Sequence, residues 1–175
     1  GAIFKADQTV SFQISKLAFL QPENQHWVGE IHVVDIGLNK KYLNDVKATH
    51  FLVTLKSVKR ILKPRSRFDH KGKFGHALLI AGSTGKVGAC ILSARATLRS
   101  GVGLLTVHVP RNGYSIIQTA VPEAMATTDQ STDFFSGRDV ESFFTTIGIG
   151  PGLGQANETV QGFEYLLKNF NRPMV

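Results

Sequence analysis

Cysteine is nearly absent from this sequence, with Cys90 as the one instance in 175 residues. A single cysteine cannot form an internal disulfide and is typical of a reducing compartment, so we expect a cytoplasmic protein. No stretch approaches the roughly 18 consecutive apolar residues of a membrane span, so we expect no membrane partner. Residues 1–7 lack an initiator methionine and the charged-then-apolar order of a signal peptide. They resemble the interior of a strand, and we expect the native chain to begin upstream.

Positive charge is in excess, because 20 Lys and Arg against 13 Asp and Glu give a formal net charge of +7. Such an excess attracts partners that carry phosphate, which include nucleic acids, nucleotides and dinucleotides. The basic residues are concentrated between Lys56 and Lys73. A solvated helix face with a linker and a local role in anion binding both remain open for this segment. Aromatic residues suited to base stacking are scarce there, with Phe68 and Phe74 alone, so we expect no nucleic-acid partner.

Three zones of the chain differ in their pattern. The first contains two segments, 9–12 and 30–36, whose composition and bounding turn residues are typical of strands. The second is more polar and contains one amphipathic helix over 54–63, which Thr54 caps and Pro64 ends. The third alternates strands with helices. We therefore predict boundaries at 1–40, 41–65 and 66–175.

The third zone has the pattern of an α/β protein. Apolar runs without polar alternation predict strands that are covered on both faces, and each is followed by a glycine- or proline-containing loop and a helix. The pattern predicts strands at 76–81, 104–109 and 145–149, and helices at 89–100, after Asn112, through 140–143, and from Asn157, as the cap, to about 168. Residues 172–175 fall where a further strand is due, and we expect the sequence to be cut at both ends.

The loop Gly82–Gly88 lies between a predicted strand and a predicted helix. Glycines permit a tight turn and the close approach of a ligand to backbone amides, and a helix N-terminus attracts anions. Gly82, Ser83 and Gly85 are therefore candidates for phosphate contact. The spacing fits neither a Walker A loop nor a Rossmann glycine motif, because Ser83 and Thr84 separate the first two glycines. A tight turn without a ligand remains the alternative.

A second glycine-rich loop, Gly150–Gly154, also follows a predicted strand and precedes a helix. The carboxyl ends of parallel strands meet at one edge of the sheet, so we expect the two loops to share a binding crevice. Lys71 is a further candidate for phosphate contact, with a solvated loop as the alternative. The six histidines lack metal-ligand spacing, so we expect no metal site. No residue pattern identifies a catalytic group.

Several of these motifs, taken together, resemble the NAD(P)H-hydrate dehydratases, which are ribokinase-like α/β proteins. The resemblance covers about residues 65–175, with its motifs in the family's order. It implies a ribokinase-like parallel-sheet sandwich, incomplete in this sequence. The matching segments are His70-Lys71-Gly72-x-x-Gly75, Ile80-Ala81-Gly82-Ser83-x-Gly85-x-x-Gly88-Ala89, Leu98-Arg99-Ser100-Gly101-x-Gly103-Leu104, Pro122-Glu123-x-Met125 and Ile149-Gly150-Pro151-Gly152-Leu153-Gly154.

Residues 1–37 resemble the closing strands of the NAD(P)H-hydrate epimerases, a Rossmann-like domain. The matching segments are Ala6-Asp7-x-Thr9-Val10-Ser11-Phe12, Lys16, and Val28-Gly29-Glu30-x-x-Val33-Val34-Asp35-Ile36-Gly37. The end of one domain followed by the start of the other implies the fused, bifunctional repair enzyme.

The resemblance implies a metabolite-repair reaction. The hydrates of NADH and NADPH (NADHX and NADPHX) would be phosphorylated by ADP or ATP, with Mg²⁺, and would then lose phosphate to restore NAD(P)H. The epimerase part would interconvert the two hydrate epimers and use a monovalent cation, K⁺. Ala89 and Gly152 would contact the hydrate, and Gly150 and Gly154 would shape the second loop.

The family's downstream catalytic aspartate segment and nucleotide-binding loops are missing from this sequence, so we expect the fragment alone to be inactive. An open sheet edge would favour a homo-oligomer. The alternatives left open are a ribokinase-like kinase for a sugar or vitamin and a basic module that binds nucleic acid or protein without catalysis.

Overall fold

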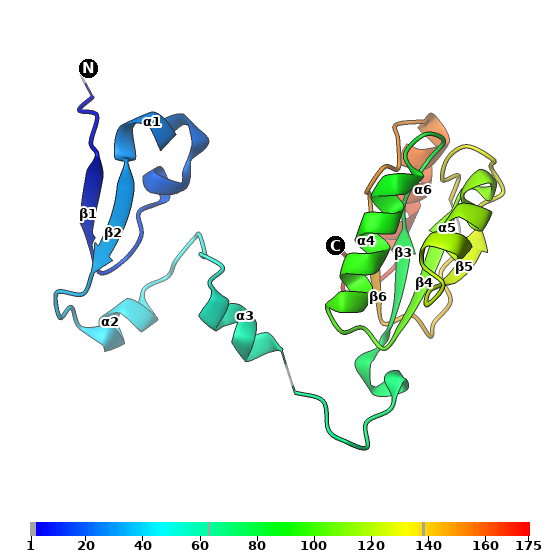
Figure 1. Cartoon of the computed structure of the whole chain (residues 1–175), viewed down its shortest axis with the longest axis horizontal. Helices are drawn as coiled ribbons and strands as arrows, with labels where there is room; N and C mark the ends of the chain where they lie inside the picture. Colours follow the sequence, from blue (N-terminus) through cyan, green and yellow to red (C-terminus); the bar gives the residue numbers. More distant parts are fainter. Residues whose placement is uncertain (1–2, 63, 138) are drawn as a thin grey trace. The chain divides into compact units, whose positions relative to one another are not determined.

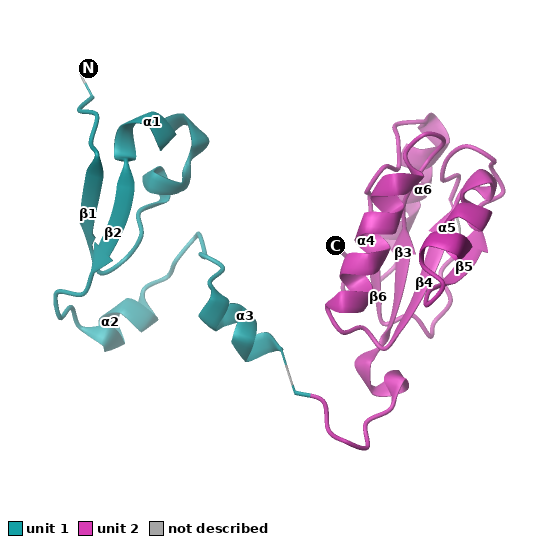
Figure 2. Ribbon diagram, viewed as in Figure 1, with its two compact units in different colours: residues 1–64 teal, residues 65–175 magenta. Residues whose placement is uncertain are grey.

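The computed structural model describes residues 3–62, 64–137 and 139–175. The chain divides into two compact units, residues 1–64 and 65–175, shown in teal and magenta in Figure 2. Each unit has its own sheet. The two are therefore described separately.

The first unit is built around two parallel strands, β1 (Gln8–Phe12) and β2 (Glu30–Val34). Their connection contains two 3-10 turns and a short helix: η1 (Leu17–Leu20), η2 (Pro22–Asn24) and α1 (Gln25–Val28). Both strands were predicted, although β2 ends two residues earlier than expected. Val10, Phe12 and Val34 remain exposed, so this small sheet buries little apolar surface by itself.

Two further helices follow, α2 (Lys40–Asp45) and α3 (Leu55–Ile61). The predicted cap of α3 is confirmed: Thr54 Oγ1 accepts a hydrogen bond from the backbone N–H of Ser57 at 3.2 Å. The Ser57 hydroxyl oxygen accepts from the backbone N–H of Thr54 at 2.8 Å, which completes a reciprocal capping box. The helix ends at Ile61, two residues before the predicted end.

The second unit contains a four-stranded sheet in which every neighbouring pair is parallel. Its strands are β3 (His76–Ile80), β4 (Leu104–Val109), β5 (Met125–Thr128) and β6 (Thr146–Ile149), in the order β5-β4-β3-β6. Met174 bridges to Ile147 in parallel on the outer side of β6. The predicted parallel α/β fold is confirmed, and Met174 lies beside β6 where a further strand was expected.

Helices cover both faces of this sheet (Figure 1). On one face lie η4 (Arg111–Gly113) and the helices α4 (Val87–Arg99) and α5 (Tyr114–Ala120), and on the other lies α6 (Asn157–Asn169). Side chains alternate between the two cores along β3, since Leu79 packs toward α4 while Leu78 and Ile80 pack toward Leu166 of α6. Burial on both faces explains the uninterrupted apolar runs in the sequence.

Two details of the predicted pattern are wrong. Residues 140–143 do not form a helix; a turn at Ser142–Phe143 is closed by the Phe144 N–H, which donates to the carbonyl of Glu141. Val140 and the next residue after the segment, Phe144, pack in the core on the α6 side of the sheet, whereas Phe143 is exposed. Asn157 is the first residue of α6 and not its cap, which is Ala156.

The two longest helices in the described part of the chain, α4 and α6, have 13 residues each. None of the described helices has the length and hydropathy needed to cross a bilayer.

Candidate functional site

The two glycine-rich loops lie side by side at one edge of the second unit's sheet. β3 and β6 are paired in parallel, and each loop leaves the carboxyl end of one of these strands. The backbone N–H of Gly82 donates to the carbonyl of Pro151 at 2.8 Å. The Ser83 hydroxyl donates to the carbonyl of Gly152 at 2.7 Å. These two bonds tie the loops into one surface.

Gly152 packs against the first turn of α4. Its φ is +68°, and a Cβ added there would lie 2.8 Å from the Lys86 carbonyl oxygen and 3.2 Å from the Ala89 Cβ. Gly154 lies nearby, because its Cβ would be 3.7 Å from Ser83 Oγ. The structure thus brings together Ala89, Gly152 and Gly154, which the sequence assigned to one site. Only glycine fits at residue 152 without displacing the helix start.

Unpaired backbone donors surround the start of α4. The N–H groups of Gly85, Val87 and Gly88 have no acceptor among the described residues, because α4 begins at Val87 and its first turn lacks intrahelical partners. Gly88 is exposed, and a Cβ added to it would meet nothing within 4 Å. The helix N-terminus carries a partial positive charge, and the exposed Lys86 adds a full one. This arrangement can bind an anion such as a phosphate.

Thr84 links this glycine loop to the loops after β4 and β5. Its backbone N–H donates to the carbonyl of Asp133 at 2.8 Å, and its hydroxyl donates to Asp133 Oδ1 at 2.6 Å. The amide nitrogen of Asn112 donates to the same hydroxyl oxygen. Asn112 Oδ1 is buried and has no partner among the described residues. All four loops at this edge therefore meet around one surface.

A buried histidine–aspartate contact lies below these loops. His108 in β4 is 4% exposed, and its Nε2 lies 3.2 Å from Oδ2 of Asp129, the first residue after β5. Burial raises the pKa of Asp129, but hydrogen bonds from Ser136 and Ser131 outweigh burial and leave the pKa below its ordinary value. The carboxylate is therefore ionised, and it organises the turn that contains Asp133.

Sequence analysis did not identify Thr84, Asn112, Asp133, His108 or Asp129 as parts of the site. Asp129 and Asp133 belong to a polar run that follows β5, a four-residue strand that was not predicted. Recognition of that strand would have placed this run at the same edge as the glycine loops.

Lys71 lies elsewhere. It belongs to η3 (Lys71–Phe74), which precedes β3 and so sits at the amino-terminal edge of the sheet. Its carbonyl packs against Gly103, immediately before β4, where a Cβ would overlap with it. The structure therefore separates Lys71 from the glycine loops with which the sequence had grouped it as a phosphate contact.

The described residues contain no group of three or more His, Cys, Asp or Glu side chains that could hold a metal ion. Cys90 is buried, and burial raises the pKa of its thiol to about 12. The thiol is consequently protonated at neutral pH and unsuited to nucleophilic attack.

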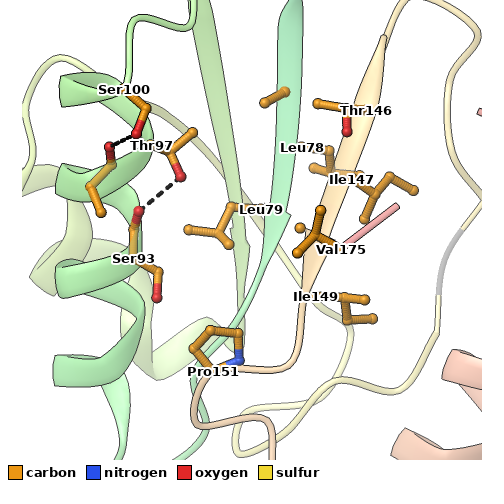
Figure 3. A pocket seen from close by; sticks show the side chains of 13 residues that line it. Leu78, Leu79, Ser93, Thr97, Ser100, Thr146, Ile147, Ile149, Pro151 and Val175 are labelled. Carbon is orange, nitrogen blue, oxygen red and sulfur yellow. Dashed lines mark hydrogen bonds between the residues drawn. The ribbon is translucent and has the colours of Figure 1, made fainter. Parts of the chain in front are cut away.

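A groove of about 470 Å³ separates α4 from β6 (Figure 3). The hydroxyls of Ser93, Thr97 and Ser100 line it, but each bonds to a backbone carbonyl one turn earlier in α4, at 2.8–2.9 Å. The sheet side is apolar, with Leu79 and Ile149 among its residues. The groove could therefore accommodate an apolar group, but the hydroxyls of α4 that line it already donate to backbone carbonyls. It differs in this respect from the surface around the glycine loops, which has free backbone donors.

Comparison with known proteins identifies one family. The NAD(P)H-hydrate dehydratase family matches residues 77–175. The bifunctional NAD(P)H-hydrate repair enzyme of Escherichia coli is 31% identical over 100% of this chain and 33% of its own length. The ADP-dependent (S)-NAD(P)H-hydrate dehydratase of Streptococcus thermophilus is 36% identical over 64% of this chain and 40% of its length. The chain thus spans about a third of the length of the bifunctional relatives it matches.

A comparison with solved structures leads to the same family. The ADP/ATP-dependent NAD(P)H-hydrate dehydratase from Bacillus subtilis, co-crystallized with ATP/Mg²⁺, is 31% identical with a TM-score of 0.60, over 69% of this chain and 43% of that one. A ribokinase-like superfamily protein from Enterococcus faecalis, 23% identical, has a TM-score of 0.59 over 74% of this chain and 47% of that one, which shows the fold alone.

Proposed function

The chain belongs to the NAD(P)H-hydrate dehydratase family, and from this premise we propose that it contributes to the ADP- or ATP-dependent dehydration of NADHX or NADPHX. The observation that carries the proposal is the joined pair of glycine loops at the carboxyl edge of β3 and β6. A dinucleotide hydrate carries a pyrophosphate, and the surface offers donors, positive charge and little steric bulk. The sugar or vitamin kinase is less well supported, because the relatives named here are hydrate dehydratases.

Each part of the surface has a distinct role in this proposal. The N–H groups of Gly85, Val87 and Gly88 hold the pyrophosphate, with Lys86 as counter-charge. Ala89 and Gly152 form a close-fitting wall against the hydrate, and Gly150 and Gly154 keep the second loop in position, both with positive φ.

The phosphoryl donor, ADP or ATP, supplies the phosphate that turns the added hydroxyl into a leaving group. We assign no donor-binding residue to this chain. The described residues contain no cluster of metal-ligating side chains, and the glycine loops offer mainly donors, so they do not fit a Mg²⁺ site. The role proposed for these residues is therefore to bind and orient the hydrate.

The first unit fits the end of an epimerase domain in this proposal. Residues 1–40 would close that domain, 41–65 would link the two, and 66–175 would begin the dehydratase. The whole chain aligns with the bifunctional enzyme of E. coli, which supports the fusion of the two domains in one chain. The predicted K⁺ belongs to the epimerase reaction, and the predicted homo-oligomer is a proposal for the whole protein.

Calorimetric titration of the purified chain with NADHX tests the proposal. We expect binding of NADHX, and no comparable binding of a sugar or a pyrimidine alcohol. Two exposed lysines provide a matched pair, because Lys86 lies at the glycine loop and Lys71 at the opposite edge. Lys86→Ala should weaken binding roughly tenfold, the loss of one contact to a charged group, whereas Lys71→Ala should not change it.

Equal losses from the two substitutions would show that net charge, and not the glycine loop, attracts the ligand. Binding of a sugar without binding of NADHX would favour the kinase.

A further inference from the structure

Thr84 is the residue through which the glycine loop is attached to the neighbouring loops. Its backbone N–H and its hydroxyl both donate to Asp133, to the carbonyl oxygen and to Oδ1. Because the hydroxyl proton points to a carboxylate that can only accept, the hydroxyl oxygen is left to accept from the amide of Asn112. One threonine therefore joins the loops after β3, β4 and β5.

Asp133 is in turn fixed by its own turn. Its backbone N–H donates to Ser131 Oγ at 3.2 Å. The Ser131 and Ser136 N–H groups donate to the two carboxylate oxygens of Asp129 at 2.8 and 2.9 Å. The buried His108 lies against the same carboxylate. The turn is thus attached to the sheet through Asp129, a residue that is 3% exposed, whereas the contact with Thr84 is exposed and can change without disturbing the core.

We infer that Asp133 and Thr84 are positioning residues, which hold the glycine loop in the conformation that binds the substrate, and that Asp129 fixes Asp133 in turn. Asp133 is not one of the residues proposed to contact the ligand. It acts through Thr84, the residue immediately before Gly85, whose free N–H belongs to the proposed anion site. The inference rests on the proposed function only for the identity of the ligand.

The sign of the Asp133 charge makes this inference testable. A carboxylate beside a site for an anion opposes binding by electrostatic repulsion. If Asp133 acted through charge, then Asp133→Ala and Asp133→Asn would both strengthen the binding of NADHX. If Asp133 instead acts by holding Thr84 in position, Asp133→Ala weakens binding roughly three- to tenfold, which corresponds to the loss of about one hydrogen bond. Asp133→Asn, which keeps an oxygen acceptor, restores wild-type affinity or exceeds it.

A second pair of variants tests the other end of the contact. Thr84→Ser keeps the hydroxyl, and Thr84→Val keeps the shape without it. Thr84 is exposed, so neither change disturbs the core. We expect Thr84→Val to weaken binding like Asp133→Ala, and Thr84→Ser to bind like the wild type.

Hydrogen exchange followed by NMR separates this inference from the proposed function, because it needs no ligand. The amide protons of Thr84 and Lys86 should exchange roughly three- to tenfold faster in Asp133→Ala and Thr84→Val than in their conservative partners. Amides of β4 should exchange at unchanged rates.

Equal exchange in all four variants, or stronger binding in both Asp133 variants, would overturn the inference. Failure of the wild type to bind NADHX, with the exchange pattern as expected, would refute the proposed function and leave the positioning role intact.

Discussion

Gly152→Ala is the substitution that most directly tests the packing of the second glycine loop against α4. The new methyl group meets two costs. The first is backbone strain, because φ is +68°, where an L-residue other than glycine costs about 1–2 kcal/mol. The second is a close contact, since the Cβ would lie 2.8 Å from the Lys86 carbonyl oxygen, and overpacking of this kind costs about 1–3 kcal/mol. We therefore expect a loss of about 2–5 kcal/mol in the free energy of unfolding of the second unit.

Gly85→Ala is the matched control. Its φ is +79°, but a Cβ there would meet nothing within 4 Å, so only the strain of about 1–2 kcal/mol applies. Urea denaturation followed by far-UV circular dichroism measures both, since α4 and α6 supply much of the helical signal. The single tryptophan, Trp27, lies in the first unit and would not report on these loops. Equal destabilisation by the two substitutions would refute the close packing of Gly152 against the start of α4.

Three further predictions concern the same unit. Gly88→Ala should stabilise the chain by about 0.5–1 kcal/mol, because Gly88 is in α4 and an added Cβ would meet open space, which urea denaturation measures. The same substitution should weaken NADHX binding, because the methyl group would lie beside the free amides. Calorimetry measures this effect, and an unchanged affinity would place the ligand elsewhere. Cys90, whose thiol pKa is raised to about 12 by burial, should resist a thiol reagent at neutral pH in the native chain and react rapidly in urea; equal rates would contradict its burial. Because the pKa of Asp129 is lowered in the folded state, its carboxylate stabilises the fold at pH values above the ordinary pKa near 3.8, and this stabilisation is lost as pH falls through the lower folded-state pKa. Asp129→Asn should therefore be less stable than the wild type at neutral pH, and by a smaller margin in acid. A constant difference in the free energy of unfolding across an acid titration would contradict the sign of this effect.

The parallel sheet and its glycine loops could be predicted because their signals are local. β3, β4 and β6 are mainly apolar and show no regular alternation of polar and apolar residues, which is the pattern of strands buried on both faces. Once the strands are parallel, the loops that follow them must gather at one edge. The same rule assigns Lys71, which precedes β3, to the opposite edge, so its separation from the glycine loops could have been predicted as well.

The rest of the site depends on long-range pairing that no local signal carries. β5 has only four residues, with Met125 exposed, and so lacks an apolar run. The contact between Thr84 and Asp133 spans 49 positions and exists only because β5 lies beside β4. Residues 140–143 suggested a helix, whereas the rings of Phe143 and the following Phe144 pack against each other and against His76. Core packing, and not helical periodicity, explains the presence of Phe144, which is buried.

The central claim is that the loops after β3 and β6 form one surface that binds a dinucleotide hydrate. An NMR titration of the isotope-labelled chain with NADHX tests it residue by residue. We expect the backbone amide shifts of 82–89 and of the non-proline residues of 150–154 to change together, with one affinity, while those of η3 remain constant. Shift changes confined to the groove between α4 and β6, or to one of the two loops alone, would contradict it.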